Sequence, residues 1–330
     1  MSTHLKDTDY LFISAKIRAM ERSALTQERM ERMLQAATPE LCAQVLGEMG
    51  YPEFDVNSEA SLYAALAKER ENVFREISAS LPDRNIVDVF KLKYDYHNLK
   101  TIIKSRGSDV SGLLLDAGRV APDTLLENYL QRGKWDFLPK ELGDAAQEAT
   151  DVLNETGDPQ KCDFILDRAY FKEMLSLAQA SRCGYLVNYV RTSIDAANLR
   201  DLVRSLRMKR PAAFLRQVLF DGGTISVDQI VAQSGSIAEL YRATILKEAA
   251  ELGEAAVNAG GSLTHFEKAL DNALLARAAD ARRIPFGVEV VIGYIIAREN
   301  DLTAARIIMT GRMAGIDPET IRERLRDSYV

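Results

Sequence analysis

Apolar residues recur at helical spacing along almost the whole chain. In the N-terminal part they are separated by steps of two to five residues within a charged background, which predicts one amphipathic helix over residues 8–36. Its apolar positions are Leu11, Ile13, Ile17, Met20, Leu25, Met30 and Leu34. Thr38 followed by Pro39 is typical of a helix start, with an N-cap and then Pro at the first helical position.

Further helical patterns follow, separated by short breakers that contain Gly or Pro. They cover residues 59–78, 84–105, 139–155, 159–180, 185–208, 236–259, 263–283 and 285–311. No stretch shows the strand-type alternation bounded by hairpin turns that a sheet requires. No Ser- or Pro-rich linker separates the helices. The pattern therefore predicts an all-α protein, with residues 1–330 forming a single body.

One segment of the chain is repeated. The sequence DYHNLKTIIKSR begins at Asp95, returns as DAANLRDLVRSL from Asp195, and returns with more substitutions as DLTAARIIMTGR from Asp301. Each copy has a basic residue five positions after the Asp. These basic residues are Lys100, Arg200 and Arg306. The apolar positions match as well: they are Leu99, Ile102 and Ile103, then Leu199, Leu202 and Val203, then Ala305, Ile308 and Met309.

A second marker follows each copy, as DAGRVAPDTL, DGGTISVDQI and the shorter AGIDPETI. Each contains a glycine, which we expect to occupy a turn with positive φ. These glycines are Gly118, Gly223 and Gly315. Each also contains an acidic residue placed for the first turn of a short helix, where negative charge is favoured. These residues are Asp123, Asp228 and Glu319. A period of about 100 residues exceeds that of helical solenoids and predicts three similar subdomains, roughly residues 8–135, 136–235 and 236–330.

The stretch YDYHNLK, from Tyr94 to Lys100, carries the densest set of reactive side chains in the chain. The other copies have Ala197 and Thr303 where this one has His97. Because the apolar stripe and the flanking charges persist while the histidine does not, we interpret the stretch as part of a helix wall. The alternative is an uncharacterised helical enzyme, in which Tyr94, Asp95 and His97 would converge in a closed pocket.

The composition of the chain and the motifs it lacks argue against several classes of function. The chain has 48 acidic and 42 basic side chains, a net charge of −6, which disfavours non-specific nucleic-acid binding. Its three cysteines are scattered, and its three histidines (His4, His97 and His265) lack metal-ligand spacing. No P-loop, H-E-x-x-H or G-x-S-x-G motif occurs. We therefore assign no catalytic, cofactor-binding or metal-binding residues. The apolar run at residues 288–297 has about half the roughly 20 residues of a membrane span.

A helix-turn-helix is a further alternative. Residues 226–245 have the right rhythm, with Gly235 in the turn and a second helix from Ser236 that would enter a DNA major groove. That helix offers one arginine, Arg242, balanced by Glu239. Base and phosphate contacts would therefore be few.

Three segments in order resemble the C-subunit family of the archaeal and bacterial V/A-type rotary ATPases, whose counterpart in the eukaryotic vacuolar enzyme is the d-subunit. DYLFISAKIRAMERSALT, with Arg18 and Glu21, is similar to the opening helix of that family. YDYHNLKTIIK and GYIIARENDLTAARIIMTGRMAGIDPETIRERL are similar to its middle and C-terminal segments. The third repeat departs most, because Ala304-Ala305-Arg306 stands where the family usually has Asn-Leu-Arg.

The resemblance implies a funnel-like, all-α body of three similar subdomains about a pseudo-threefold axis. It implies a non-catalytic central-stalk rotor protein that couples the membrane rotor ring (c/K ring) to the D–F shaft and so supports ion transport. The protein would be peripheral, on the cytoplasmic face of the membrane, with no span of its own and no nucleic-acid partner. The choice between H⁺ and Na⁺ would lie in the ring. We expect the free protein to be a monomer.

Overall fold

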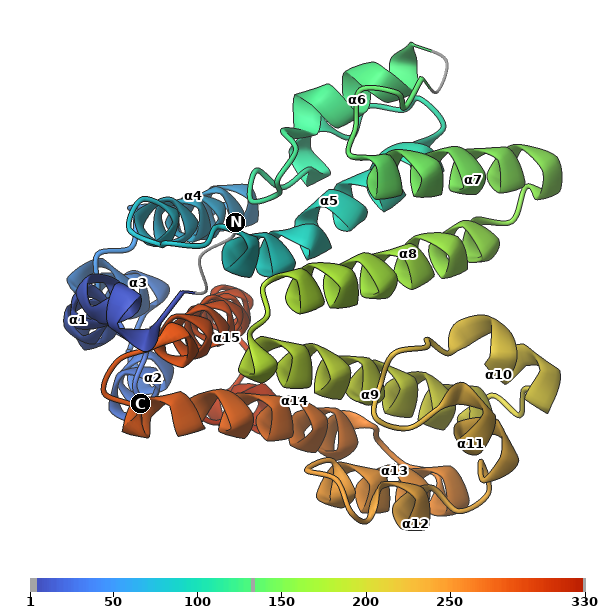
Figure 1. Cartoon of the computed structure of the whole chain (residues 1–330). Coiled ribbons are helices and arrows are strands. Elements are labelled where there is room, and N and C mark those ends of the chain that lie inside the picture. The colour runs from blue at the N-terminus through green and yellow to red at the C-terminus, as the bar shows by residue number, and fades with distance from the viewer. Residues whose placement is uncertain (1–4, 132–133, 329–330) are drawn as a thin grey trace. The chain divides into compact units, whose positions relative to one another are not determined.

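The computed structural model of the chain describes residues 5–131 and 134–328, so the predicted histidine His4 lies outside the described residues (Figure 1). Every regular element within those two ranges is a helix, and no strand occurs in them. The all-α class predicted from the sequence is thus confirmed.

The helices form two compact units, each of which is described by itself. Unit 1 comprises residues 1–83 and 235–330, and unit 2 is the intervening segment, residues 84–234. The single body and the three repeat ranges predicted from the sequence stay predictions. One unit boundary falls beside a repeat boundary, near residue 235, and the other lies near residue 84.

Unit 1 is organised around α15, Val288–Met313, which is buried along most of its length. The 16 buried residues of α15 include Ile292, Ile295 and Ile308, and a helix that is apolar on nearly every face belongs inside a core. Helices from both ends of the chain pack on it. The other helices of unit 1 are η1 Asp7–Tyr10, α1 Leu11–Met20, η2 Glu21–Ser23, α2 Gln27–Gln35, α3 Pro39–Glu48, α4 Glu59–Ser78, α12 Ile237–Tyr241, α13 Lys247–Ala259, α14 Thr264–Ala279, η4 Asp280–Arg283 and α16 Pro318–Arg324.

Unit 2 is built on three long helices in which α8, Pro159–Ala180, packs against both α5, Asn85–Ser105, and α9, Gly184–Arg207 (Figure 1). Its other helices are η3 Ser111–Leu113, α6 Pro122–Leu130, α7 Lys140–Thr156, α10 Ala212–Val218 and α11 Val227–Ala232. The apolar positions shared by the repeats are all in the cores of their units, each at most 1% exposed. The apolar stripe of each repeat is therefore a packing face.

The helix start predicted at Thr38 is confirmed. The Thr38 hydroxyl accepts the Leu41 N–H with Pro39 at the first helical position, and the Ser58 hydroxyl accepts the Ser61 N–H in the same way at the start of α4. These side chains satisfy backbone donors that the helix itself leaves unpaired.

The single helix predicted over residues 8–36 is wrong, because the chain breaks between α1 and α2. The Leu25 N–H donates to Asp301 Oδ2 at 3.0 Å, and Thr26 begins α2 as its N-cap. The tertiary hydrogen bond to Asp301 thus interrupts the continuous helix that the local periodicity predicts.

The helix predicted over residues 236–259 is also wrong, since it divides into α12 and α13. Between them the Thr244 hydroxyl donates to the Tyr241 carbonyl and accepts the Leu246 N–H, at 2.8 and 3.1 Å. Such side-chain bonds offer the backbone an alternative to the helix.

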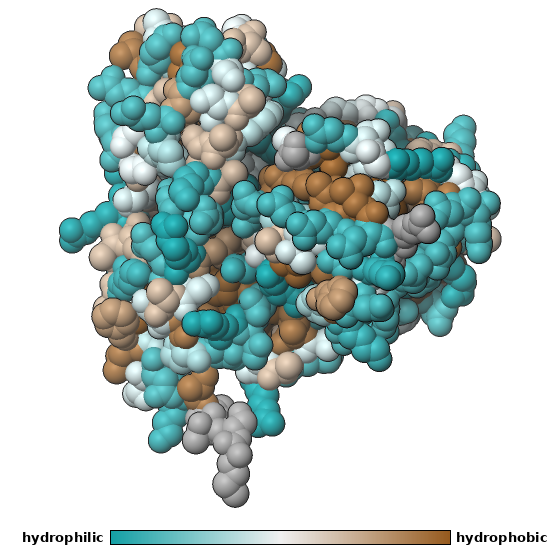
Figure 2. Space-filling model, turned by 90° about the horizontal axis from the view of Figure 1, so that it is seen from above, coloured by the Kyte–Doolittle hydropathy of each residue, from teal (hydrophilic) through white to brown (hydrophobic). Residues whose placement is uncertain are grey.

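Hydrophobic side chains reach the surface as separate patches between hydrophilic ones on the face shown in Figure 2. The large exposed apolar side chains include Phe12 and Phe137, which are 72% and 80% exposed. Among the described residues, no helix combines the length and the apolar composition needed to cross a membrane.

Residues 84–234 form a compact unit with its own core, so we expect this fragment to fold when expressed alone. Circular dichroism should show a helical fragment that unfolds in one cooperative thermal transition. A fragment that is largely unstructured, or that melts without cooperativity, would show that its fold requires the rest of the chain.

Candidate functional site

The reactive stretch from Tyr94 to Lys100 lies on α5 as helix wall. Asp95 is fully buried and its carboxylate binds Arg119, whereas His97 is exposed, with its Nε2 3.3 Å from the Leu113 carbonyl. Because Asp95 and His97 face different surroundings, the helical-enzyme alternative lacks the convergence it requires. In the ranges that the structure describes, no group of three or more His, Cys, Asp or Glu side chains could hold a metal ion.

Asp95 holds the loop that follows α5. Its Oδ1 accepts the backbone N–H groups of Arg119 and Val120, at 2.9 and 3.1 Å. Three residues later on the same helix, the Asn98 side chain accepts the Leu115 N–H and donates to the Leu115 carbonyl, both at 2.9 Å. Residues three apart share a helix face, so the two side chains grip one loop together. We call this pair of residues and its contacts a clasp.

The second repeat forms the same clasp. Asp195 accepts the N–H groups of Thr224 and Ile225, at 3.0 and 3.2 Å. Asn198 exchanges two hydrogen bonds with Phe220, at 2.8 and 2.9 Å. Buried backbone groups that would otherwise lose their water partners are satisfied in both loops. The repeated sequence therefore corresponds to a repeated set of contacts in unit 2.

Positive φ is not the reason for Gly118 and Gly223, so that expectation is wrong for both, whereas Gly315 does have a φ of 69°. The clasps explain these two glycines instead. A Cβ on Gly118 would stand 2.2 Å from Asp95 Oδ1, and a Cβ on Gly223 would stand 2.2 Å from Asp195 Oδ1. Glycine is required because the carboxylate lies against the backbone.

The third copy uses its aspartate differently. Asp301 Oδ2 accepts the Leu25 N–H and a hydrogen bond from Arg298 Nη1, both at 3.0 Å, and Arg298 also pairs with Glu69 at 2.6 Å. The position of the clasp asparagine is occupied by Ala304, and a Cβ on Gly315 would meet nothing within 4 Å. Asp301 therefore fastens the N-terminal segment to α15.

The three basic residues of the repeat differ in their surroundings. Lys100 forms an ion pair with Asp167 of α8. Arg200 is half-buried on α9, whereas Arg306 is exposed on α15. The acidic residues Asp123, Asp228 and Glu319 all occupy first turns of short helices, as predicted.

Sequence reasoning missed the buried partners of the first clasp. Arg119 bridges Asp95 and Glu173, with its Nε 3.0 Å from Asp95 and its Nη2 2.7 Å from Glu173. The Tyr96 hydroxyl donates to Glu173 at 2.8 Å. Burial raises the pKa of Asp95, against the opposing effect of the Val120 N–H and the Arg119 guanidinium. No motif marks Glu173, which lies 77 residues beyond Tyr96.

Arg18 of α1 links the two chain segments that make up unit 1. It pairs with Glu21 at 2.8 Å, and its Nη2 donates to the carbonyls of Ala281 and Ile284, at 3.1 and 2.7 Å. The sequence singled out Arg18 and Glu21 without indicating this role.

The helix-turn-helix alternative is contradicted by the helix lengths. The first helix of the segment, α11, has six residues, and the second, α12, has five. A recognition helix of five residues is too short to fill a major groove.

Substitution of either clasp glycine by alanine should destabilise unit 2. Gly118→Ala or Gly223→Ala would force Cβ into a buried carboxylate, and we expect each to lower the free energy of unfolding by about 1–3 kcal/mol. Gly184→Ala, at the start of α9 with nothing within 4 Å, is the matched control and should cost nothing. Urea denaturation measures all three, and equal stabilities would contradict the close-approach explanation.

Asp201 should give unit 2 a pH-dependent stability. Burial raises its pKa from 3.8 to about 6, with Asp167 adding to the effect and Arg204 opposing it. A raised folded-state pKa means that stability present near pH 4 is lost as the pH rises through 6. The free energy of unfolding relative to Asp201→Asn should therefore fall by about 2 kcal/mol between pH 4 and pH 7. A difference that stays constant over this range would refute the prediction.

Comparison with known proteins shows to which family the chain belongs. The family model described as ATP synthase (C/AC39) subunit matches residues 13–324. The C-subunit of the V-type sodium ATPase of Enterococcus hirae is 22% identical over 326 residues, covering 97% of this chain and 99% of the relative. The C-subunits of the A-type ATP synthases of Haloquadratum walsbyi and Haloferax volcanii are each 26% identical, covering 94% and 95% of this chain and 96% of each relative. The chain therefore belongs to the ATP synthase (C/AC39) subunit family.

Proposed function

We propose that this protein is a non-catalytic rotor component of the central stalk of a V/A-type ATPase or ATP synthase. It would couple the membrane rotor ring to the D–F shaft, on the cytoplasmic face of the membrane. The observation that carries the proposal is the family match over residues 13–324, which spans nearly the whole chain.

The internal contacts suit a part that transmits torque. Such a part must resist deformation, and the clasps fasten loops of unit 2 to α5 and α9 through buried, doubly bonded side chains. In unit 1, Asp301 and Arg18 fasten segments far apart in the sequence. The hydrogen bonds of Asp301 and Arg18 involve charged groups and contribute about 1.5–3 kcal/mol each, so these two junctions resist local opening.

The sequence supports a role without nucleotide chemistry. It contains no P-loop, and the side chains that suggested an enzyme do not converge. ATP would be bound and hydrolysed elsewhere in the complex. The two matching clasps support a common origin of the first two repeats. In this proposal three related subdomains surround a pseudo-threefold axis to form a funnel that receives the shaft.

Titration calorimetry against the purified D–F pair from the same source tests the proposal. We expect saturable one-to-one binding, and light scattering should show that the free protein is a monomer. A D–F pair from which the segment inserted into this protein has been deleted is the control and should not bind. Absence of binding in the presence of the purified membrane ring as well, with all samples folded, would contradict the proposed role.

A further inference from the structure

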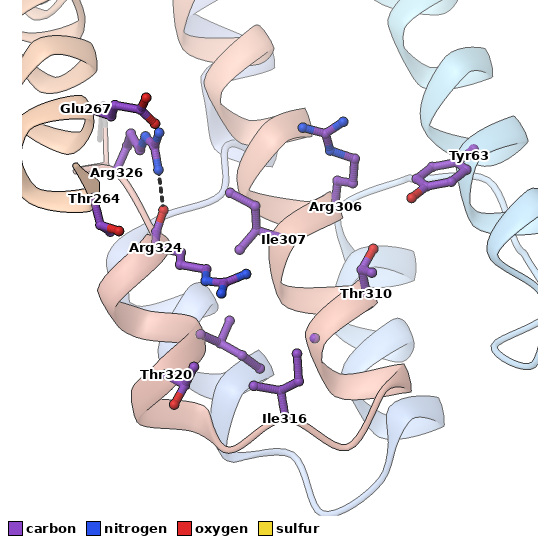
Figure 3. A pocket seen from close by; sticks show the side chains of 12 residues that line it. Tyr63, Thr264, Glu267, Arg306, Ile307, Thr310, Ile316, Thr320, Arg324 and Arg326 are labelled. Carbon is purple, nitrogen blue, oxygen red and sulfur yellow. Dashed lines mark hydrogen bonds between the residues drawn. The ribbon is translucent and has the colours of Figure 1, made fainter. Parts of the chain in front are cut away.

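A pocket of about 440 Å³ opens in unit 1 among α4, α14, α15 and α16 (Figure 3). Three of its lining residues are arginines, namely Arg306 of α15, Arg324 of α16 and Arg326 just beyond α16. Figure 3 shows Arg324 extending from α16 across the pocket toward α15. Among the described residues that line the pocket, Glu267 alone is acidic. In a chain with a net charge of −6, this is a local excess of positive charge.

Two of the three arginines are available to a ligand. Arg326 is committed, because its guanidinium forms an ion pair with Asp271 at 2.8 Å. Arg306 and Arg324 are exposed, and neither guanidinium forms an ion pair with any residue that the structure describes. An exposed guanidinium group without an ion pair is suited to bind a carboxylate or phosphate, and two such groups line this pocket.

The repeat indicates which anion. Arg306 occupies the position of Lys100, whose ammonium group pairs with Asp167 of the packed helix α8. In the first copy the chain thus supplies its own carboxylate to the basic residue of the repeat. At Arg306 a pocket takes the place of such a partner. By analogy with Lys100, the expected partner of Arg306 is the carboxylate of a protein side chain on a helix.

The rest of the lining favours a side chain over a free phosphate. Ile307, Ile316 and the buried Ile321 give the pocket an apolar wall. The Thr310 Oγ1 is buried and has no hydrogen-bond partner among the described residues. A glutamate or aspartate within an apolar segment would place its stem and neighbours on the isoleucines and its oxygens at the arginines, whereas phosphate has no apolar part to bury.

We propose that this pocket receives an acidic segment of a partner protein of the complex, whose carboxylates pair with Arg306 and with Arg324 while adjoining apolar side chains cover Ile307 and Ile316. The inference rests on the proposed function, because the partner is taken to be the D–F shaft or the rotor ring. It adds the chemistry by which that partner is held.

The test is charge reversal in the full-length protein. The variant is Arg306→Glu with Arg324→Glu, and the matched control is Arg22→Glu with Arg283→Glu, two exposed arginines of unit 1 outside the pocket. Melting temperatures establish that both variants fold. Titration against the D–F pair, and against the purified ring in detergent, should show a loss of affinity of about tenfold or more for one partner in the pocket variant only.

The outcomes separate the inference from the proposed function. Binding of both partners by the pocket variant as tightly as by wild type would overturn the inference and leave the proposed function standing. Failure of the wild type to bind either partner would overturn both. Undiminished partner binding, together with a rise in wild-type melting temperature in inorganic phosphate that the pocket variant lacks, would overturn the inference in favour of a small-anion site.

Discussion

The structure of this protein depends on carboxylates placed against backbone amides inside a helical core. Asp95 and Asp195 each accept two N–H groups from the loop that follows their helix, and Asp301 accepts one from a segment 276 residues away. A buried carboxylate is costly unless it is bonded, so each of these positions is tolerated only with its loop in place. Because carboxylate and loop depend on each other, the irregular loops are fixed to the long helices.

The three copies of the repeat use the same aspartate position to make different contacts. In unit 2 the partner is the nearby loop, and glycine at 118 and 223 lets it approach the carboxylate. In unit 1 the same aspartate position holds the N-terminal segment, and Ala304 stands at the position of the clasp asparagine. The basic residue of this copy, Arg306, lines a pocket, whereas Lys100 of the first copy forms an internal ion pair.

The sequence was sufficient where local pattern and tertiary packing agree. The apolar stripe of the repeat predicted the buried face of α5, α9 and α15, and Thr38 with Pro39 predicted a helix start. It failed where distant groups compete with local preference, as at Leu25, where Asp301 takes the amide that a continuous helix would use. It found the aspartates and glycines of the clasps but not their reason, because periodicity does not show that a carboxylate occupies the space of a Cβ at Gly118 and Gly223. Glu173 had no signal at all.

If the carboxylates hold these loops against the helices in solution, the bonded amides must be protected from exchange with solvent. Hydrogen exchange of the native protein, followed by NMR at single amides, measures this protection. We expect the N–H groups of Leu25, Arg119, Val120, Thr224 and Ile225 to exchange as slowly as those in the middle of α5 and α9, although none of them lies within a helix. Exchange of these amides at the rates of unstructured peptides, while the helices remain protected, would contradict this expectation.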